Sequence, residues 1–299
     1  MSVITAIGAV ILDHWLGETR QFHPLAGFGT LANRVENYFN YEGQGDRAAG
    51  LLSLSLLVLP LVYITWLLSD GLGPLFDLAL LYLALGGQSL AEHGRAVQVA
   101  LEADDLVTAR GRVGEIVSRD TAGMEERDII RATIESILEN GNDAIFGTLF
   151  WFFVAGAPGV ALYRLVNTLD AMWGYRNDRF QLFGEATAKL DDLLNWVPAR
   201  LTAWAYCAVG HWHEGRHCWR TQAHLLSSPN GGPVMTAGAG SLGVELGGPA
   251  SYHGEVQKRP YFGTHRLPEV SDIHRALDMV HKSLFLWLTA AVIWGVLFA

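Results

Sequence analysis

Charged side chains are scarce in this chain of 299 residues. Only 17% of the residues are Asp, Glu, Lys or Arg, against about 25% in a typical soluble domain, and half of the chain is hydrophobic. Such a composition excludes an intrinsically disordered chain, a collagen-like rod and a coiled coil. It also argues against an ordinary soluble globule, because too few side chains are available to face water.

Cysteine and lysine are also rare. Cys207 and Cys218 are the only cysteines and form no C-x-x-C pair, so we expect free thiols in a reducing compartment or a membrane. The few lysines leave most of the positive charge to arginines, whose planar guanidinium suits bidentate contacts with carboxylates and phosphates. A compositional bias toward arginine explains the same count equally well. The net charge is −9 and no basic patch is present, so nucleic acid is not an expected partner.

Long apolar segments are what the chain does contain. Residues 48–69 carry no charged side chain and exceed the ~20 residues that a helix needs to cross the hydrocarbon core of a membrane. A buried core helix is the alternative, and the length argues against it. Residues 72–85, 144–163 and 283–299 are weaker candidates for further membrane segments. The pattern predicts an all-α, polytopic integral membrane protein with long cytoplasm-facing helical segments that form the active site.

Three polar stretches, residues 88–143, 164–200 and 214–282, lie between the apolar segments. Arginines crowd the first stretch, and the positive-inside rule therefore places it in the cytoplasm. Residues 144–163 contain the helix-breaking sequence Gly-Ala-Pro-Gly at 156–159, where we expect a hairpin that keeps all polar stretches cytoplasmic. Because no internal repeat is present, residues 1–299 are predicted to form a single membrane-embedded domain.

Acidic side chains recur every four residues along the predicted helix 125–140. Arg131, Glu135, Glu139 and Asp143 share one face, opposite a row of isoleucines. The two glutamates would repel each other unless Arg131, a metal or a cationic ligand intervenes. A solvated stripe is the simpler explanation for this pattern taken alone.

A second group of polar residues follows between positions 167 and 195. Asn167 and Asp170 share a helix face, and so do Asp192 and Asn195. Carboxylate and amide oxygens suit Mg²⁺, which also takes water or phosphate ligands. Helix capping is the ordinary alternative, but these acids lie in apolar sequence, where carboxylates are costly without partners.

Two glycine- or histidine-containing motifs have simpler explanations. Gly238, Gly240 and Gly243 spell G-x-G-x-x-G, but no strand precedes them, so close helix packing is favoured over dinucleotide binding. The loop 227–232 before them could still hold an anion on its backbone amides. Residues 213–217 spell H-E-x-x-H, the zinc motif of metalloproteases. Five-residue motifs arise by chance and Gly215 weakens the helix, so zinc is not expected.

Five segments together resemble the CobD/CbiB family of cobalamin biosynthesis, the adenosylcobinamide-phosphate synthases. They are residues 12–29, 118–143, 161–203 and 228–254, with a fainter match at 259–277. The resemblance implies a multi-pass protein of the cell inner membrane. Its reaction joins aminopropanol, or its O-phosphate, to the f-propionate carboxylate of adenosylcobyric acid. The family's reaction uses ATP, through an acyl phosphate, and Mg²⁺; no P-loop sequence is present.

The resemblance also directs the assignment of residues. The expected catalytic acids are Glu139, Asp143, Asp170, Asp191 and Asp192, of which Glu139, Asp143, Asp191 and Asp192 would hold Mg²⁺. The expected substrate- and phosphate-binding residues are Arg119, Asp120, Glu135, Asn140, Arg164, Asn167, Tyr175, Arg176, Lys189, Asn195, Arg200, Ser228 and Asn230. Expected partners are the corrinoid, the amine and membrane lipid, with a homo-oligomer or other cobalamin-pathway enzymes left open. The alternative functions are an intramembrane zinc protease and a non-catalytic membrane sensor of the AmpE type.

Overall fold

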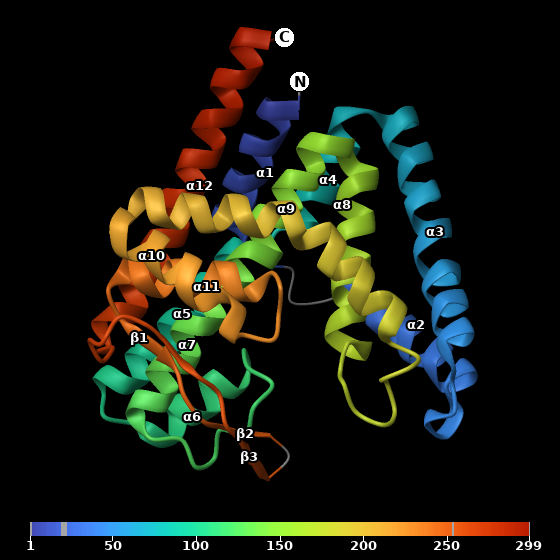
Figure 1. Ribbon diagram of the computed structural model, residues 1–299. Coiled ribbons are helices and arrows are strands. Elements are labelled where there is room, and N and C mark those ends of the chain that lie inside the picture. The colour runs from blue at the N-terminus through green and yellow to red at the C-terminus, as the bar shows by residue number, and fades with distance from the viewer. Residues whose placement is uncertain (1, 19–22, 253, 299) are drawn as a thin grey trace. The chain divides into compact units, whose positions relative to one another are not determined.

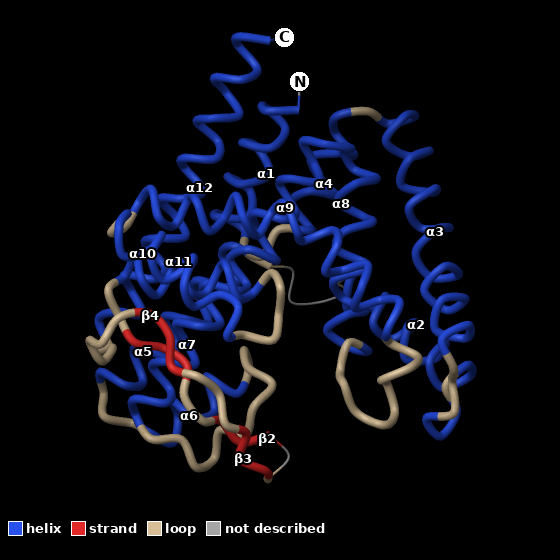
Figure 2. The backbone as a smooth tube through the Cα atoms, viewed as in Figure 1, coloured by secondary structure: helices blue, strands red, loops and turns tan. Residues whose placement is uncertain are grey.

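The computed structural model describes residues 2–18, 23–252 and 254–298, and these are mostly helical (Figures 1 and 2). They divide into two compact units. The first comprises Met1–Gly86 and Gly147–Trp196, and the second comprises Gly87–Phe146 and Val197–Ala299. The predicted all-α class is confirmed. That the whole chain forms one membrane-embedded domain stays a prediction.

The first unit is built from α1 (Ser2–Leu16), α2 (Pro24–Phe39), the 3₁₀ turn η1 (Tyr41–Gly43), α3 (Arg47–Leu72), α4 (Pro74–Ala84), α8 (Gly147–Trp173) and the start of α9 (Glu185–Val209). Local chemistry sets several boundaries. Asp46 caps α3 by accepting a hydrogen bond from the backbone N–H of Ala49, and the helix continues through Pro60. Gly73, at φ 65°, then allows the turn after which Pro74 starts α4.

The α8 helix reverses direction part-way along its length. Ala155 and Gly156 leave helical geometry, with Gly156 at φ 62°. A straight helix would separate Gly147 from Tyr163 by about 24 Å. Instead, a Cβ on Gly147 would collide with the Tyr163 hydroxyl, and one on Gly159 would collide with the backbone of Trp151. The reversal lies beside the Gly-Ala-Pro-Gly sequence at which a bend is expected.

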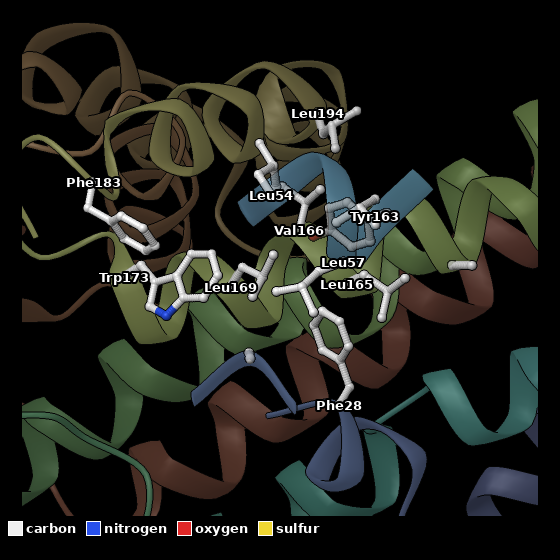
Figure 3. Close-up of a cluster of buried hydrophobic side chains, with 13 residues drawn as sticks. Phe28, Leu54, Leu57, Tyr163, Leu165, Val166, Leu169, Trp173, Phe183 and Leu194 are labelled. Carbon is white, nitrogen blue, oxygen red and sulfur yellow. The ribbon is translucent and has the colours of Figure 1, made fainter. Parts of the chain in front are cut away.

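A hydrophobic core holds the first unit together (Figure 3). Residues from α2, α3, the second half of α8, the loop before α9 and α9 itself meet there: Phe28, Leu54, Leu57, Tyr163, Leu165, Val166, Leu169, Trp173, Phe183 and Leu194. Trp173 and Phe183 are in edge-to-face contact. This core fixes the segment of α8 and α9 that carries the second group of polar residues.

The second unit contains α5 (Gly87–Glu102), α6 (Leu106–Gly114), α7 (Glu126–Asn140), the π-helical turn η2 (Gly141–Phe146), the end of α9, α10 (Trp212–Gln222), η3 (Ala223–Leu225), α11 (Gly231–Leu242) and α12 (Ser271–Phe298). Four short strands were not predicted. β1 (Glu245–Gly247) pairs antiparallel with β4 (Tyr261–Gly263), and β2 (Ala250–Tyr252) with β3 (Glu255–Gln257) (Figure 2).

Among the residues that the structure describes, four helical stretches are long and apolar enough to cross a membrane: Arg47–Leu72, Pro74–Glu102, Glu126–Trp173 and Ser271–Leu297. They contain the predicted segments 48–69 and 144–163 and overlap most of 72–85 and 283–299. On α3, Leu59 and Tyr63 are about 60% exposed, and on α12 Phe285 and Val296 are more than 70% exposed. Large apolar side chains exposed in this way along whole helices suit contact with lipid. The protein is thus a membrane protein.

Candidate functional site

A cavity of about 470 Å³ lies within the second unit. Its wall combines residues 116–119, one face of α7, the loop before α11 and the segment from β3 to β4. The predicted residues Arg119, Glu135, Glu139, Asn140 and Ser228 all line it. A volume of this size suits a small polar ligand or one end of a larger one.

Glu135 is the buried centre of an ion-pair network beside the cavity. Its Oε2 accepts hydrogen bonds at 2.8 Å from Nη2 of Arg119 and at 2.8 Å from Nη2 of Arg259. Its Oε1 accepts one from the backbone N–H of Gly247 at 2.9 Å. Arg119 and Arg259 thus offset the repulsion expected between Glu135 and Glu139, in place of the Arg131 that the sequence suggested. Arg131 instead pairs with Glu245 at 2.6 Å.

Glu139 differs from Glu135 although it lies one helical turn away. It is half-buried, lines the cavity and has no hydrogen-bond or ion-pair partner among the described residues. One of its carboxylate oxygens lies 2.8 Å from where a Cβ on Gly231 would stand, so the glycine leaves room for this acid. Glu139 is therefore a carboxylate in a cationic cavity with its oxygens available to a ligand.

The loop before α11 is held by its own side chains. Ser228 Oγ accepts the backbone N–H groups of Asn230 at 3.3 Å and Gly231 at 2.9 Å, and the Ser228 carbonyl accepts that of Gly232. Arg200 donates to Asn230 Oδ1 at 2.8 Å and to the Pro229 carbonyl at 3.1 Å. Three amides of the loop are thus already engaged, which argues against the anion cradle that its glycines suggest.

Other predicted residues of the second unit have structural contacts. Asp120 holds the β2–β3 hairpin, because its carboxylate accepts hydrogen bonds from Ser251 Oγ and from the Gly254 backbone. Asn140 donates to Ser136 at 3.0 Å. Asp143, in the π-helical turn, accepts a hydrogen bond from Asn142 at 2.8 Å. The assignment of these three residues to substrate or metal stays a prediction.

In the first unit, the polar residues of α8 and α9 surround Asp191. Asn167 and Asn195 each donate to one of its carboxylate oxygens at 3.2 Å, and Tyr163 donates to Asn195. Burial raises the pKa of Asp191 above its usual range despite these two hydrogen bonds. Burial likewise raises the pKa of Asp192, against the opposing charge of Arg176. The sequence placed these acids in apolar surroundings, where a carboxylate is costly. The burial of Asp191 and Asp192 confirms such surroundings.

The remaining predicted residues of the first unit lie around this group. Asp170, on α8, is close enough to Asp191 and Asp192 to feel their charges. Arg164 reaches Asn167 at 3.5 Å. Three residues are exposed: Tyr175, Arg176 and Lys189, the last paired with Glu185 on its own helix. The predicted set therefore falls into two groups, one in each unit.

Comparison with known proteins gives the family. The sequence model described as CobD/CbiB protein matches residues 6–280. The chain is 54% identical to the cobalamin biosynthesis protein CobD of Stutzerimonas stutzeri, with both chains covered completely. It is 50% identical to that of Chromobacterium violaceum over 97% of each chain, and 40% identical to that of Mycobacterium tuberculosis over 91% of this chain and 90% of the relative. The chain belongs to the CobD/CbiB family.

A role in cobalamin biosynthesis follows from this membership. The resemblance on which the residues were chosen is therefore confirmed. No solved structure matches the chain. Within the CobD/CbiB fold described above, the segments 118–143, 228–254 and 259–277 all reach the cavity of the second unit.

Arg259 and Lys258 line the cavity but are absent from the predicted set. Arg259 lies within the faintest of the family-like segments, and its role depends on contacts with Glu135 that are distant in sequence. The pair of basic residues before Pro260 was the only local signal.

The ATP and Mg²⁺ that the CobD/CbiB resemblance implies can be tested against the donor groups. Among residues 2–18, 23–252 and 254–298, no three His, Cys, Asp or Glu side chains converge on a metal position. Mg²⁺ keeps several waters and needs only one or two carboxylates beside phosphate oxygens. Glu139, next to Arg119 and Arg259, fits such a site. Asp191 and Asp192 belong to the other unit.

The H-E-x-x-H sequence lies on α10, which packs against α11 (Figure 1). His213, Glu214 and His217 are exposed, whereas Gly215 and Cys218 are buried. A Cβ on Gly215 would meet Ser241, and one on Gly240 would lie 2.6 Å from the Glu214 carbonyl. Gly215, Gly238 and Gly240 thus permit close helix packing, as predicted for the latter two. Gly243 has open space around it and instead ends α11 at φ 72°.

This packing gives opposite expectations for adjacent residues. Gly215→Val should lower the melting temperature, because overpacking a tight helix contact costs about 1–3 kcal/mol. Glu214→Gln should leave both the melting temperature and product formation unchanged, because its side chain is exposed. Differential scanning fluorimetry of the purified protein measures the melting temperature, and mass spectrometry of the product measures its formation. Loss of activity in Glu214→Gln with a normal melting temperature would instead support metal chemistry at this motif.

The buried Asp191 makes stability depend on pH. Because its pKa is raised in the folded state, folding favours the protonated form, and stability falls as the pH rises from about 4, the unfolded pKa, through the raised value. Asp191→Asn should therefore show a shallower decrease of melting temperature between pH 4 and 8 than the unmodified protein. The exposed Asp178→Asn is the control and should follow the unmodified profile. Equal slopes for all three proteins would contradict the buried charge.

Proposed function

We propose that this protein is a carbon–nitrogen ligase. It joins the f-propionate carboxylate of adenosylcobyric acid to (R)-1-amino-2-propanol or its O-phosphate, with ATP and Mg²⁺. Membership of the CobD/CbiB family supports the pathway and the ligation. The observation that carries the chemistry is the cavity of the second unit. Glu139, whose carboxylate has no partner among the described residues, lines it together with Arg119, Lys258 and Arg259.

The steps balance without a redox partner. Transfer of the γ-phosphoryl group of ATP to the propionate oxygen gives ADP and an acyl phosphate. The amine nitrogen then attacks the acyl carbon, phosphate leaves, and the nitrogen loses a proton. Glu139 is the residue placed to accept that proton, because no described residue occupies its oxygens. Mg²⁺, when bound, would be held by Glu139 and phosphate oxygens and would offset phosphate charge.

Arg119 and Arg259 serve the phosphate side of this chemistry. Guanidinium groups hold phosphoryl oxygens through charge-assisted hydrogen bonds and do not need to reorganise as charge moves during transfer. Glu135 engages both guanidiniums, and neither forms an ion pair with Glu139, so the nearby proton acceptor is not neutralised. The acids of the first unit, Asp170, Asp191 and Asp192, remain the second proposed catalytic group.

Direct detection of the product tests the proposal. Detergent-purified protein is incubated with adenosylcobyric acid, aminopropanol phosphate, ATP and Mg²⁺, and the corrinoids are separated and weighed by mass spectrometry. The expected result is the mass of the amide, dependent on ATP and accompanied by one ADP per amide. Unchanged corrinoid with either form of the amine, at any ATP concentration, would refute the ligase and favour the non-catalytic sensor.

We further propose that the protein lies in the inner membrane with its polar stretches toward the cytoplasm, the side that supplies ATP. Cys207 and Cys218 are buried, so a cysteine introduced at the exposed Asp178 should be the main reactive thiol. A membrane-impermeant maleimide should label Asp178→Cys in inside-out vesicles and not in intact spheroplasts. Labelling in spheroplasts alone would place this stretch on the periplasmic side.

A further inference from the structure

The cavity of the second unit contains a cationic group whose bound ligand the ligase chemistry leaves open between two phosphorylated substrates. Arg119, Lys258 and Arg259 contribute three positive charges, while Glu135 and Glu139 contribute two negative ones. Both carboxylate oxygens of Glu135 already accept hydrogen bonds, from the two arginines and from Gly247, so Glu135 presents no free oxygen to a ligand. The network therefore leaves net positive charge facing the cavity, and it holds that charge in place.

Glu135 orients the guanidinium groups of Arg119 and Arg259, and each group still has N–H donors that do not contact Glu135. Each uses only Nη2 to reach Glu135, and an arginine has five N–H donors. The other terminal nitrogen of Arg259, Nη1, is buried and has no hydrogen-bond partner among the described residues. A buried donor without an acceptor is destabilising, and an anion bound against this guanidinium would supply the missing acceptor.

Neighbouring groups that could compete for an anion are engaged elsewhere. Arg200 binds Asn230 and the Pro229 carbonyl, and the amides of residues 230–232 bind Ser228. Arg131 pairs with Glu245 and lies 5.0 Å from the centre of the Tyr261 ring. Arg119, Lys258 and Arg259 thus remain as the cations of this wall.

From these contacts we infer that Arg259 and Arg119, with Lys258 beside them, bind a phosphoryl group of a substrate, and that Glu135 orients the two arginines. The inference rests on the proposed function and adds Arg259 and Lys258 to the substrate-binding residues predicted from the sequence. The phosphoryl group belongs either to the amine substrate or to ATP, and the chemistry that recognises it is the same. Lys258 is exposed and flexible, so it adds charge, whereas Arg259 sets the geometry.

Arg259→Ala tests the inference when the ligands are varied separately. The Michaelis constant for aminopropanol phosphate is measured at saturating ATP and that for ATP at saturating amine. Titration calorimetry with ATP, aminopropanol phosphate and inorganic pyrophosphate gives binding without turnover. We expect at least a tenfold weakening for one phosphorylated substrate, because a charge-assisted hydrogen bond contributes about 1.5–3 kcal/mol. Arg259→Lys should recover part of this loss.

Two further variants separate binding from folding. Lys258→Gln leaves the Glu135 pairs intact and should weaken the same ligand by about two- to tenfold. Arg220→Ala, at an exposed position of α10 in the same unit, should match the unmodified protein. If affinity is lost only for aminopropanol phosphate and free aminopropanol is turned over normally, the bound phosphoryl group belongs to the amine. If affinity is lost only for ATP, the phosphoryl group belongs to the nucleotide.

Unchanged affinities and Michaelis constants in both Arg259→Lys and Lys258→Gln would overturn the inference. The ligase proposal fails separately, if the unmodified protein forms no amide. In that case calorimetry with pyrophosphate still decides the anion site, since binding that is weakened by Lys258→Gln supports it and equal binding by both proteins refutes it.

Discussion

Glu139→Gln should lower the rate of amide formation by about 10²–10⁴-fold while leaving the protein folded. The range is the usual contribution of a positioned general base, and the amide that replaces the carboxylate keeps its shape but cannot accept the proton. Glu139 has no partner among the described residues, so no ion pair is broken by the change. The measurement is the initial rate of product formation at saturating substrates, together with the melting temperature.

Glu126→Gln is the matched control, because Glu126 lies on the same helix and is exposed. It should retain the full rate. A Glu139→Gln protein that keeps more than about a tenth of the rate would remove Glu139 as the base. The proton acceptor would then have to be sought among Asp170, Asp191 and Asp192 of the first unit.

Glu135→Ala should destabilise the fold by about 3–5 kcal/mol, the usual cost of leaving buried charges without their partner. The Glu135 side chain is 3% exposed, and those of Arg119 and Arg259 are 13% and 21% exposed, so water cannot replace the lost carboxylate fully. Removal of Glu135 also leaves the Gly247 amide without its acceptor. The measurement is the melting temperature and the denaturant midpoint in a fixed detergent.

Replacing the whole ion-pair network is the informative comparison. A triple variant, Arg119→Met, Glu135→Leu and Arg259→Met, should recover most of the lost stability, because a buried ion pair exchanged for apolar groups is often neutral. It should nevertheless lose the affinity for phosphorylated ligand. A Glu135→Ala protein as stable as the exposed Glu126→Ala variant would show that the arginines do not depend on this carboxylate.

Periodicity predicted much of this structure because helix geometry is local. The four-residue spacing from Arg131 to Asp143 correctly placed Glu135 and Glu139 one turn apart on α7. The uncharged run 48–69 correctly predicted a long apolar helix. Glycines at 238 and 240 were correctly assigned to close packing, because residues without a side chain in a helix interior usually mark a close neighbour.

Other features depend on residues that meet only in three dimensions. Nothing in the spacing distinguishes Glu135 from Glu139, yet Glu135 accepts three hydrogen bonds whereas Glu139 has no partner among the described residues. The difference comes from Arg259, which lies 124 positions after Glu135 in the chain. Likewise, the spacing gives no sign that Arg200 and Ser228, both predicted to bind substrate, also hold the loop before α11 through their hydrogen bonds.

The sequence by itself determined the helical class, the membrane segments and the family, because these follow from composition, periodicity and local motifs. It also determined that acids and arginines would share the polar stretches. Only the tertiary structure decided which charges neutralise one another and which remain available to a ligand. The reason is physical: the energy of a charge depends on its burial and on the partners within a few ångströms, and for Glu135 and Glu139 those partners come from segments far along the chain.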